Sequence, residues 1–546
     1  MFDWPATIDA LPPGTDPGRA ERLAERLAAD GAAPPGARFA RLTAFAAACS
    51  PHLAQAMTRE AGLLPEIAAH GPAAVAEAGI AACAAAAQAE GREDLFARLR
   101  VAKRRTALAI ALGDIAGALS LDEVTGALTR LADAAVSAAL AFFLRTETQS
   151  GRFRPADLSA PALESGIIVL AMGKYGAFEL NYSSDIDFVV FFDAARIPVA
   201  DGVQPVPFLV RVVQNVVKAL QERTGDGYVF RTDLRLRPDA GATQIAVSTE
   251  AAALYYEGMG QNWERAAMIK ARACAGDIPA GEAFLSEMRP FVWRKYLDFA
   301  AIEDIHSIKR QIHAAKGGAA VAIAGHDVKL GRGGIREIEF FAQTQQLILG
   351  GRYPALRSRR TLDALRALTE DAVVSIEAER DLKDAYVYLR TLEHRIQMVS
   401  DEQTHRLPEN TAERANVATF LGFADPAAFE ARTLSVFRTV ERHYAKLFES
   451  SAPLAAAEGS LVFTGVDDDP ETLTTLAAQG FKRPDSVSAA VRGWHHGRMA
   501  ATRSARAREL LTALMPALRA AFAKQRTPDA GLARLDGVFG RLAAGV

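Results

Sequence analysis

Two hydrophobic periods divide this chain into one region of strands and long stretches of helix. Near the middle, residues 167–172 and 188–192 are continuous apolar runs, long enough for buried strands and too short for typical helices. After the second run, apolar residues recur every three to four positions from Phe208 to Leu220, which predicts a helix over 207–223. The pattern therefore predicts a mostly helical α+β fold that contains one α/β domain.

The same pattern predicts four structural regions. Residues 1–145 form a helical region, and residues 146–280 hold the only clear strands and form the α/β domain. Residues 281–452 form a second helical domain, and a joint at 452–469 leads to a small helical bundle at 470–546. The helices expected outside the α/β domain are 18–29, 37–48, 72–89, 95–112, 300–315, 335–349, 358–369, 377–398, 429–448 and 503–524.

Two acids open the second apolar run. Strand alternation puts Asp185 and Asp187 on one side, while Ile186 and Phe188 point into the core. Like charges about 6.5 Å apart repel by about 2.5 kcal/mol at an effective dielectric of about 20. A divalent cation would relieve this repulsion, and paired carboxylates are a usual way to hold Mg²⁺ beside phosphate oxygens. The alternative is two solvated acids on an edge strand, which the flanking apolar runs and the preceding glycine turn disfavour.

A polar segment connects the two apolar runs. It begins with a turn at Gly173 and Lys174 and ends with the pair Ser183 and Ser184. Hydroxyls and main-chain N–H groups in such a glycine turn suit contact with phosphate. A Gly-Lys pair alone is a weak signal, and the P-loop pattern is absent, which disfavours an ATPase of that class.

Residues 228–238 alternate between apolar and polar and predict a further strand. Its polar face carries Arg231, Asp233, Arg235 and Arg237, which is too charged to be buried without ligands. The planar side chains of Arg235 and Arg237 could bind phosphate oxygens bidentately. The alternative is a solvated edge strand with an internal ion pair.

Residues 327–341 combine a glycine-rich turn with the start of a predicted helix. Helix N-termini offer unpaired N–H groups to anions, and Lys329, Arg332 and Arg336 add full positive charges there. Glu337 and Glu339 could neutralise those cations or touch a metal, and the sequence does not decide between these roles. A helix cap with a salt-bridge network is the structural alternative.

Residues 262–273 are predicted to form a helix with a charged flank. Arg265, Met268, Ile269 and Arg272 fall on one side of it, and Lys270 lies two turns from the start. An ordinary amphipathic helix with solvated charges would have the same pattern.

Composition excludes several classes of function. The 546 residues carry a formal net charge of −2, so no global basic field favours nucleic acid. Three widely spaced cysteines indicate a reducing compartment, and the histidines show no metal-ligand spacing. Neither a signal peptide nor a run of 18 apolar residues is present, so we expect a cytoplasmic protein without a membrane segment.

Four motifs in this order resemble the bifunctional glutamine synthetase adenylyltransferase/adenylyl-removing enzymes of the nucleotidyltransferase superfamily. They are GKYGAFELNYSSDIDFVVFF (173–192), DLRLRPDAG (233–241), NWERAAMIKARA (262–273) and DVKLGRGGIREIEFFAQ (327–343). Outside residues 173–343 the resemblance is weaker. The family carries two catalytic domains, whereas one D-x-D signature is present here. We therefore expect a fragment or a truncated relative that holds the first catalytic half, with residues 470–546 beginning the central linker or regulatory region.

The resemblance implies roles for particular residues. Asp233 would be the third carboxylate of a Mg²⁺ site with Asp185 and Asp187, although 46 residues separate it from Asp187. The turn with Gly173, Lys174, Ser183 and Ser184 would hold the nucleotide phosphates. Lys270 and Arg272 would bind phosphate or the protein partner, with Lys329 and Arg332 at the second glycine turn.

The resemblance also implies a reaction that regulates nitrogen assimilation. In the first half of these enzymes, phosphate attacks the α-phosphorus of an adenylyl-tyrosine on glutamine synthetase and releases ADP, while the full-length enzyme also adds AMP from ATP. The expected partners are glutamine synthetase and a PII-type signal protein. Tyrosinate, with a free pKa of about 10, is a tolerable leaving group, so this direction needs no strong base. The reverse direction needs one, and Asp233 is the only obvious candidate.

Two other functions stay open from the sequence. A small-substrate nucleotidyltransferase would share the acidic strand, but it would lack the motif at 329–341. A regulatory scaffold that binds glutamine synthetase or a PII-type protein without turnover would be expected to have lost at least one of the three aspartates.

Overall fold

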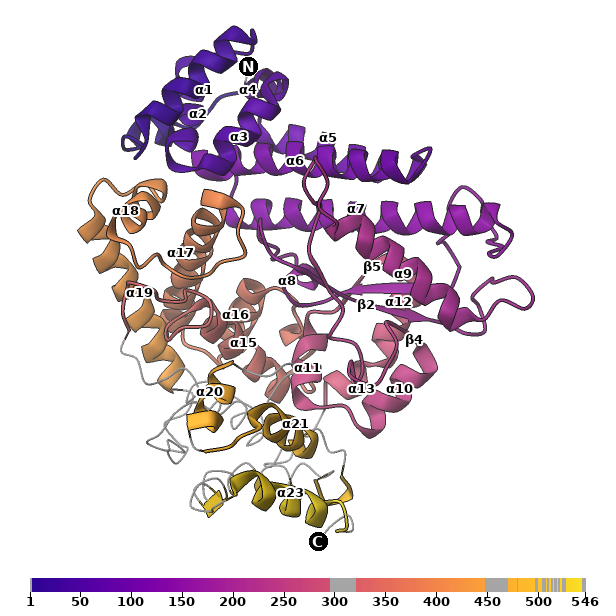
Figure 1. Ribbon diagram of the computed structural model, residues 1–546. Helices are drawn as coiled ribbons and strands as arrows, with labels where there is room; N and C mark the ends of the chain where they lie inside the picture. The colour runs from indigo at the N-terminus through magenta and orange to yellow at the C-terminus, as the bar shows by residue number, and fades with distance from the viewer. Residues whose placement is uncertain are drawn as a thin grey trace.

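The computed structural model describes residues 2–294, 321–446 and parts of 470–542. Three long helices, α5 (Pro72–Ala85), α6 (Arg92–Ala116) and α7 (Leu121–Gln149), run side by side across the upper part of Figure 1. The helices expected at 18–29, 37–48, 72–89 and 95–112 are confirmed, with shifted ends. The smaller elements before them are η1 (Ala6–Ala10), α1 (Pro17–Ala29), α2 (Ala37–Cys49), α3 (Pro51–Arg59), η2 (Ala61–Leu63) and α4 (Leu64–His70), and η3 (Ala86–Gln88) follows α5.

Helix α7 is the one helix among the described residues that is long and apolar enough to cross a membrane. Of its most apolar 18-residue window, 78% is buried inside the protein. It begins with a capping box, in which Ser120 and Glu123 exchange side-chain and backbone hydrogen bonds. Its apolar surface packs against α5, α6, α9 and the sheet, so its role as a core helix explains its composition.

The five-stranded sheet has the order β3-β2-β1-β5, and β4 also pairs with β2. Strand β1 is antiparallel to β2 and β5, whereas β3 and β4 are parallel to β2. The runs expected at 167–172 and 188–192 are confirmed as β1 and β2. The strands are β1 (Ile167–Ala171), β2 (Ile186–Phe192), β3 (Thr232–Asp233), β4 (Ala246–Ser248) and β5 (Arg272–Gly276).

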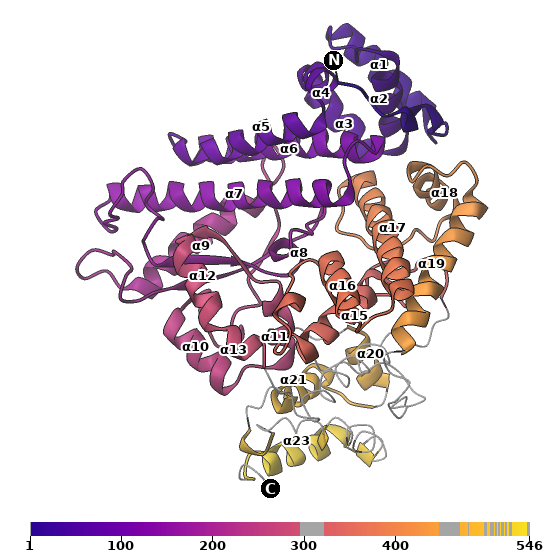
Figure 2. The ribbon, with the colours of Figure 1, turned by 180° about the vertical axis from the view of Figure 1, so that it is seen from behind.

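Both faces of the sheet are buried against helices, which is why β1 and β2 have continuous apolar sequences. Val169 and Phe188 share a core with α7 and with α9 (Pro205–Gln221), the helix expected at 207–223. Leu170 and Val189 pack on the opposite face against α10 to α13. Figures 1 and 2 show α7 above the sheet and α10 and α13 below it. The helices of this lower layer are α10 (Thr249–Gly258), α11 (Asn262–Ile269), α12 (Ile278–Glu287) and α13 (Arg289–Val292).

A second helical group packs beside the sheet and has its own core. The helices expected at 335–349, 358–369, 377–398 and 429–448 are confirmed, whereas those at 300–315 and most of 503–524, together with the joint at 452–469, lie outside the described residues. The elements are α15 (Ile335–Leu349), η4 (Pro354–Leu356), α16 (Thr361–Glu370), α17 (Ile376–Ser400), α18 (Thr411–Phe420) and α19 (Pro426–Lys446), followed by α20 (Pro470–Ala478), α21 (Pro484–His495), η5 (Ala500–Thr502) and α23 (Pro528–Phe539).

The strand expected over 228–238 is wrong except for its centre. Only Thr232 and Asp233 pair with β2. Before them, Val229 and Phe230 are both buried and both donate their backbone N–H to the Leu220 carbonyl, so the side chains do not alternate. After them the chain turns, and the guanidinium of Arg237 donates to carbonyls of its own loop. Alternation in the sequence here reflects a loop stabilised by arginine, not a strand.

The helix expected over 262–273 ends early. Helix α11 stops at Ile269 with Lys270 as its C-cap, and Arg272 begins strand β5. The prediction failed because Ala273, Cys274 and Ala275 are small residues that suit either structure, and pairing with β1 decided in favour of a strand. Arg272 consequently points to Asp133 on α7, 2.9 Å away, rather than along the helix.

Candidate active site

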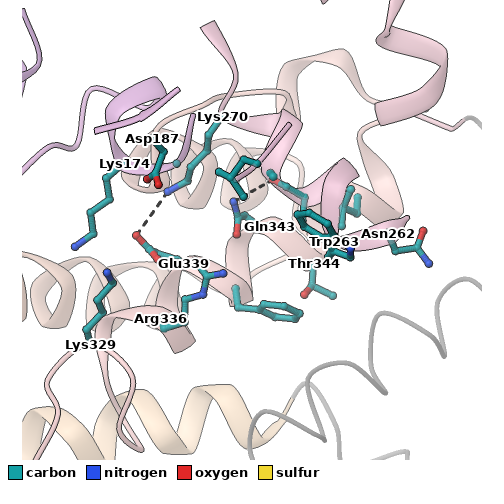
Figure 3. Close-up of a pocket in the computed structure, with 16 residues that line it drawn as sticks. Lys174, Asp187, Asn262, Trp263, Lys270, Lys329, Arg336, Glu339, Gln343 and Thr344 are labelled. Carbon is teal, nitrogen blue, oxygen red and sulfur yellow. Dashed lines mark hydrogen bonds and ion pairs between the residues drawn. The ribbon is translucent and has the colours of Figure 1, made fainter. Parts of the chain in front are cut away.

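A cavity of about 340 Å³ lies where the turn after β1, the start of β2, α11 and α15 meet. Figure 3 shows charged side chains gathered at one end and Trp263, Asn262 and Thr344 at the other. Five of the predicted site residues line it, namely Gly173, Lys174, Asp187, Lys270 and Lys329. The remaining lining residues are Leu236, Asn262, Trp263, Ala266, Ala267, Arg336, Glu339, Phe340, Gln343, Thr344 and Leu347.

Of the three predicted carboxylates, Asp187 is the one that lines this cavity. Burial and the negative charge of the neighbouring Asp233 raise its pKa to about 7, and Lys329 only partly offsets them. No hydrogen bond or ion pair within the described part of the chain neutralises its carboxylate. It continues the β2 face of Val189 and Phe191, at the end where the helices leave that face uncovered.

The glycine turn is shaped to admit Asp187. Gly173 has a φ of +53°, and a Cβ on it would lie 2.7 Å from the Asp187 carboxylate. A Cβ on Gly176 would lie 2.0 Å from the Lys270 carbonyl oxygen, so the turn also packs directly on the end of α11. The four-residue helix α8 (Gly173–Gly176) therefore needs glycine at both ends to bring Lys174 and Asp187 to one cavity.

The other two predicted carboxylates lie beside Asp187, but arginines hold both of them. Parallel pairing puts Asp233 of β3 directly opposite Asp187 of β2. Arg235 donates its backbone N–H and its guanidinium to Asp233; burial opposes ionisation of that carboxyl, and these contacts outweigh it and lower its pKa. Arg231 Nε lies 3.1 Å from Asp185 Oδ1. In the described residues no three acidic, histidine or cysteine side chains are close enough to hold one metal ion.

The arrangement fits a divalent cation at Asp187 and Asp233. A buried carboxylate with a raised pKa beside a second carboxylate is the electrostatic situation that a bound cation stabilises. Asp187 and Asp233 would hold it, and Asp185 would join them only if it left Arg231. Carboxylates with phosphate oxygens are the donor set that Mg²⁺ accepts.

The cations of the cavity differ in how they are neutralised. Lys270 Nζ lies 2.8 Å from Glu179 and 3.6 Å from Glu339, and Lys174 Nζ lies 2.9 Å from Glu393. Arg336 lies 3.5 Å from Glu339. For Lys329, the described residues offer no carboxylate within ion-pair distance. Lys329 is therefore the cation of the turn at 327–334 that is available to an anion in the cavity.

Several predicted site residues have structural partners outside the cavity. The hydroxyl of Ser183 donates to Asp401, and its backbone N–H donates to Gln397. Arg332 pairs with Glu441 of α19 rather than lining the cavity. Arg237 binds its own loop, and Ser184 lies outside the cavity lining. Glu337 accepts a hydrogen bond from the Gly333 N–H. Arg272 pairs with Asp133, as described above.

Sequence reasoning missed the acids that position the cationic side chains. Glu179 binds Lys270 and the backbone and hydroxyl of Thr361, and Glu393 of α17 binds Lys174. These partners are 91 and 219 residues apart along the chain. Only the position of Glu179 inside the first motif could have drawn attention to it, and nothing in the sequence marks Glu393.

Comparisons with known proteins agree with the motifs. The family model described as glutamate-ammonia ligase adenylyltransferase matches residues 40–287, and the one described as GlnD PII-uridylyltransferase matches residues 306–448. Two relatives are named bifunctional glutamine synthetase adenylyltransferase/adenylyl-removing enzyme. The one from Agrobacterium fabrum is 54% identical over 83% of this chain and 46% of its own length, and the one from Caulobacter vibrioides is 49% identical over 98% and 54%. The chain thus spans about half the length of the curated relatives it matches.

Proposed function

We propose, from the match of residues 40–287 to the glutamate-ammonia ligase adenylyltransferase family model, that this chain is a Mg²⁺-dependent nucleotidyltransferase that acts on glutamine synthetase. We propose that it removes AMP from an adenylyl-tyrosine by phosphorolysis. Inorganic phosphate enters, ADP leaves, and unmodified glutamine synthetase is released. The full-length relatives carry both activities in their names, and one half of such an enzyme would carry one of them.

The observation that carries this proposal is Asp187 at the charged end of a cavity that is apolar at its other end. The charged end supplies Lys329 and Arg336 for phosphate oxygens and Asp187 with Asp233 for a cation. The apolar end, with Trp263, Ala266, Ala267 and Leu347, has the flat and largely apolar lining that a nucleobase needs. A cavity of about 340 Å³ is large enough for a nucleotide.

The chemistry follows from these positions. A phosphate oxygen attacks the α-phosphorus of adenylyl-tyrosine, a new phosphorus–oxygen bond forms, and the bond to the tyrosine oxygen breaks. Lys329 would hold the incoming phosphate, and the apolar end of the cavity would bind the adenosine. The attacking phosphate oxygen and the leaving tyrosine oxygen would then lie in line across the α-phosphorus. Bound Mg²⁺ would supply positive charge to the phosphate oxygens.

The acid–base properties favour this direction over adenylylation. Phosphate is already ionised at neutral pH, so the attack needs no strong base. Attack by a tyrosine hydroxyl does need one, and Asp233 was the only candidate in the sequence. The pKa of Asp233 is lowered because Arg235 holds its carboxylate, which makes Asp233 a weak base.

The proposed partners are glutamine synthetase as the protein substrate and a PII-type signal protein as a regulator. The match of residues 306–448 to a PII-uridylyltransferase model supports a relation to PII signalling. The proposed setting is the cytoplasm, where the enzyme would regulate nitrogen assimilation.

One assay tests the function directly. The chain is incubated with AMP-modified glutamine synthetase, phosphate and Mg²⁺, and ADP formation is followed together with loss of the modification. We expect ADP that depends on phosphate and is absent with Asp187→Asn. AMP release without phosphate would indicate hydrolysis, and AMP transfer from ATP without ADP formation in the first assay would indicate the opposite direction. Binding without any turnover would support the scaffold alternative.

A further inference from the structure

A second cavity, of about 360 Å³, lies between the first helical region and the α/β domain. Its walls come from α3, α6, the turn at 223–228 and the C-terminal end of α17. It shares no lining residue with the cavity that holds Asp187. Five arginine or lysine side chains and one histidine line it, against two aspartates: Arg59, Arg100, Lys103, Arg104, Arg223, His52, Asp226 and Asp401.

Three of the five cations already have partners. Arg59 lies 2.6 Å from Asp226, and Arg104 lies 2.5 Å from Glu60. Arg100 is buried and donates to backbone carbonyls, including that of Gly227 at 2.9 Å. These three arginines hold the helical region on the α/β domain and are not available to a ligand.

Lys103 and Arg223 are different. Within the described part of the chain, neither has a carboxylate within ion-pair distance. Both lie over the ring of Tyr228, at 5.1 and 5.3 Å from its centroid, and Arg231 approaches the same ring at 5.3 Å. Three like charges around one ring repel one another, and a bound anion would remove this repulsion.

Both aspartates of the cavity already have partners, and Asp226 is the one that Arg59 holds. Asp401 accepts hydrogen bonds from the hydroxyls of Ser183 and Tyr228. Gln397 is fully buried, and its Oε1 accepts the Ser183 N–H, which fixes the orientation of the amide. Its Nε2 has no acceptor in the structure. An ammonium, a guanidinium and a buried amide N–H thus face one cavity without an acceptor to match them.

We propose that this cavity is a second anion site, which takes a phosphate dianion, either free or carried on a small molecule. Two unpaired cations match a doubly charged ligand, and the several oxygens of a phosphate can accept from Lys103, Arg223 and Gln397 together. The volume exceeds that of one phosphate, so it also accommodates a small phosphate ester. Anion binding here does not require the proposed phosphorolysis, because the residues that line this cavity lie outside the cavity of Asp187.

Arg231 lines neither cavity, but it connects Tyr228, which lines the second cavity, to Asp185 at the start of β2. Its guanidinium lies over Tyr228, donates to the Tyr228 hydroxyl at 3.1 Å, and holds Asp185 through Nε. An anion beside Tyr228 competes with Asp185 for this guanidinium. An anion bound at the second site therefore weakens the ion pair between Arg231 and Asp185. By reciprocity, strengthening that ion pair weakens anion binding at the second site.

His52 provides a local reporter for the test. It lines the cavity; burial lowers its pKa, and so does the charge of Lys103, while Asp401 opposes them. The whole chain, labelled on histidine, is titrated at pH 7.5 with inorganic phosphate and, separately, with glycerol 2-phosphate. The His52 signal is identified from its loss in His52→Gln. We expect a saturable shift of this signal, and tighter binding of the ester than of phosphate would identify a phosphorylated small molecule as the ligand.

Four variants decide the outcome. Lys103→Gln should weaken phosphate binding, as reported by the His52 signal, by about tenfold or more, because a charged donor is lost. Lys383→Gln, the same change at an exposed lysine of α17, should leave the titration unchanged, and so should Lys329→Gln in the other cavity. Arg223→Gln repeats the test at an exposed residue whose replacement leaves the fold intact. Absence of a saturable His52 shift, an unchanged titration in both Lys103→Gln and Arg223→Gln, or its loss in Lys329→Gln would overturn the proposal.

Discussion

The buried carboxylates around the active-site cavity fall into two groups that differ in what neutralises them. Glu393 touches Lys174 at 2.9 Å, His405 at 2.8 Å and Arg390 at 3.3 Å. Burial opposes its charge, but the charges of Lys174 and Arg390 and the contact with His405 outweigh burial and keep the pKa of Glu393 well below the usual range. Asp187, which lines the cavity, has no such contact in the described residues, and burial raises its pKa to about 7.

This difference separates positioning from chemistry. Glu393 lies on α17 and binds Lys174 of the glycine turn, which is distant in the chain. Its charge is therefore neutralised by a contact that stabilises the fold. Glu339 is similar, because burial is outweighed by Lys270 and Lys174 and its pKa falls to about 2. Asp187 has no such partner among the described residues, so its carboxyl stays protonated up to about pH 7, and compensation of its ionised form is left to a ligand or a metal ion. Uncompensated charge in a cleft is thus the better marker of function.

The largest effect should come from Asp187→Asn. Loss of the carboxylate should lower deadenylylation by about a thousandfold or more, because it removes a group proposed to hold the cation. The midpoint of thermal unfolding should stay the same or rise, since repulsion from Asp233 and the cost of burying charge both disappear. Turnover and thermal midpoint are measured on the same preparation. A collapsed midpoint would move Asp187 into the group of structural acids.

Glu393→Gln, in contrast to Asp187→Asn, should destabilise the fold. It leaves Lys174 and Arg390 buried without their acid, which should lower the free energy of unfolding by about 3–5 kcal/mol. Denaturant unfolding measures this, with Glu402→Gln, an exposed acid just beyond α17, as the matched control. A change within the error of the control would show that the clamp between α17 and the glycine turn is not a stabilising contact.

The sequence was sufficient for the parts of the site that local pattern determines. Strands β1 and β2 were visible as apolar runs, whereas the position of Asp233 beside Asp187 was expected only from the family resemblance. The parallel register of β2 and β3 is what puts the two acids opposite each other. The alternating pattern at 228–238 wrongly predicted a strand, because Arg235 and Arg237 stabilise a turn whose sequence also alternates. The acids Glu179 and Glu393 could not be foreseen. Their partners come from other elements of the fold, and a lone glutamate on a helix carries no sign of burial.

The pH dependence of Mg²⁺ binding should distinguish Asp187 from the paired acids Glu393 and Glu339. The folded pKa of Asp187, about 7, lies above its unfolded value near 3.9. The native state therefore holds a proton that the unfolded state releases, and without metal this contribution to stability is lost as pH rises from about 4 to 7. Mg²⁺ must displace that proton, so its apparent affinity should fall about tenfold per pH unit below 7.

Thermal midpoints with and without Mg²⁺ between pH 5.5 and 8.5 measure this. The rise caused by Mg²⁺ should grow up to about pH 7 and then level off, and it should be absent in Asp187→Asn. Glu264, whose pKa burial also raises to about 7, contributes a change of stability with pH that Mg²⁺ does not affect. A Mg²⁺ effect of equal size at pH 5.5 and 8.5 would contradict the assignment of Asp187 as the titrating ligand.

The smallest effects should distinguish two cations only three residues apart in the glycine-rich turn. Lys329 lines the cavity without a carboxylate partner among the described residues, whereas Arg332 is paired with Glu441. Lys329→Gln should raise the phosphate concentration needed for half-maximal rate by about tenfold. Arg332→Gln should leave the phosphate requirement within about twofold and cost no more than about 1 kcal/mol of stability, as expected for a partly exposed pair. The motif alone predicts a phosphate effect for Arg332 as well. If the two variants shift the phosphate titration equally, the turn binds the anion as one unit, and the distinction between paired and unpaired charges fails at this position.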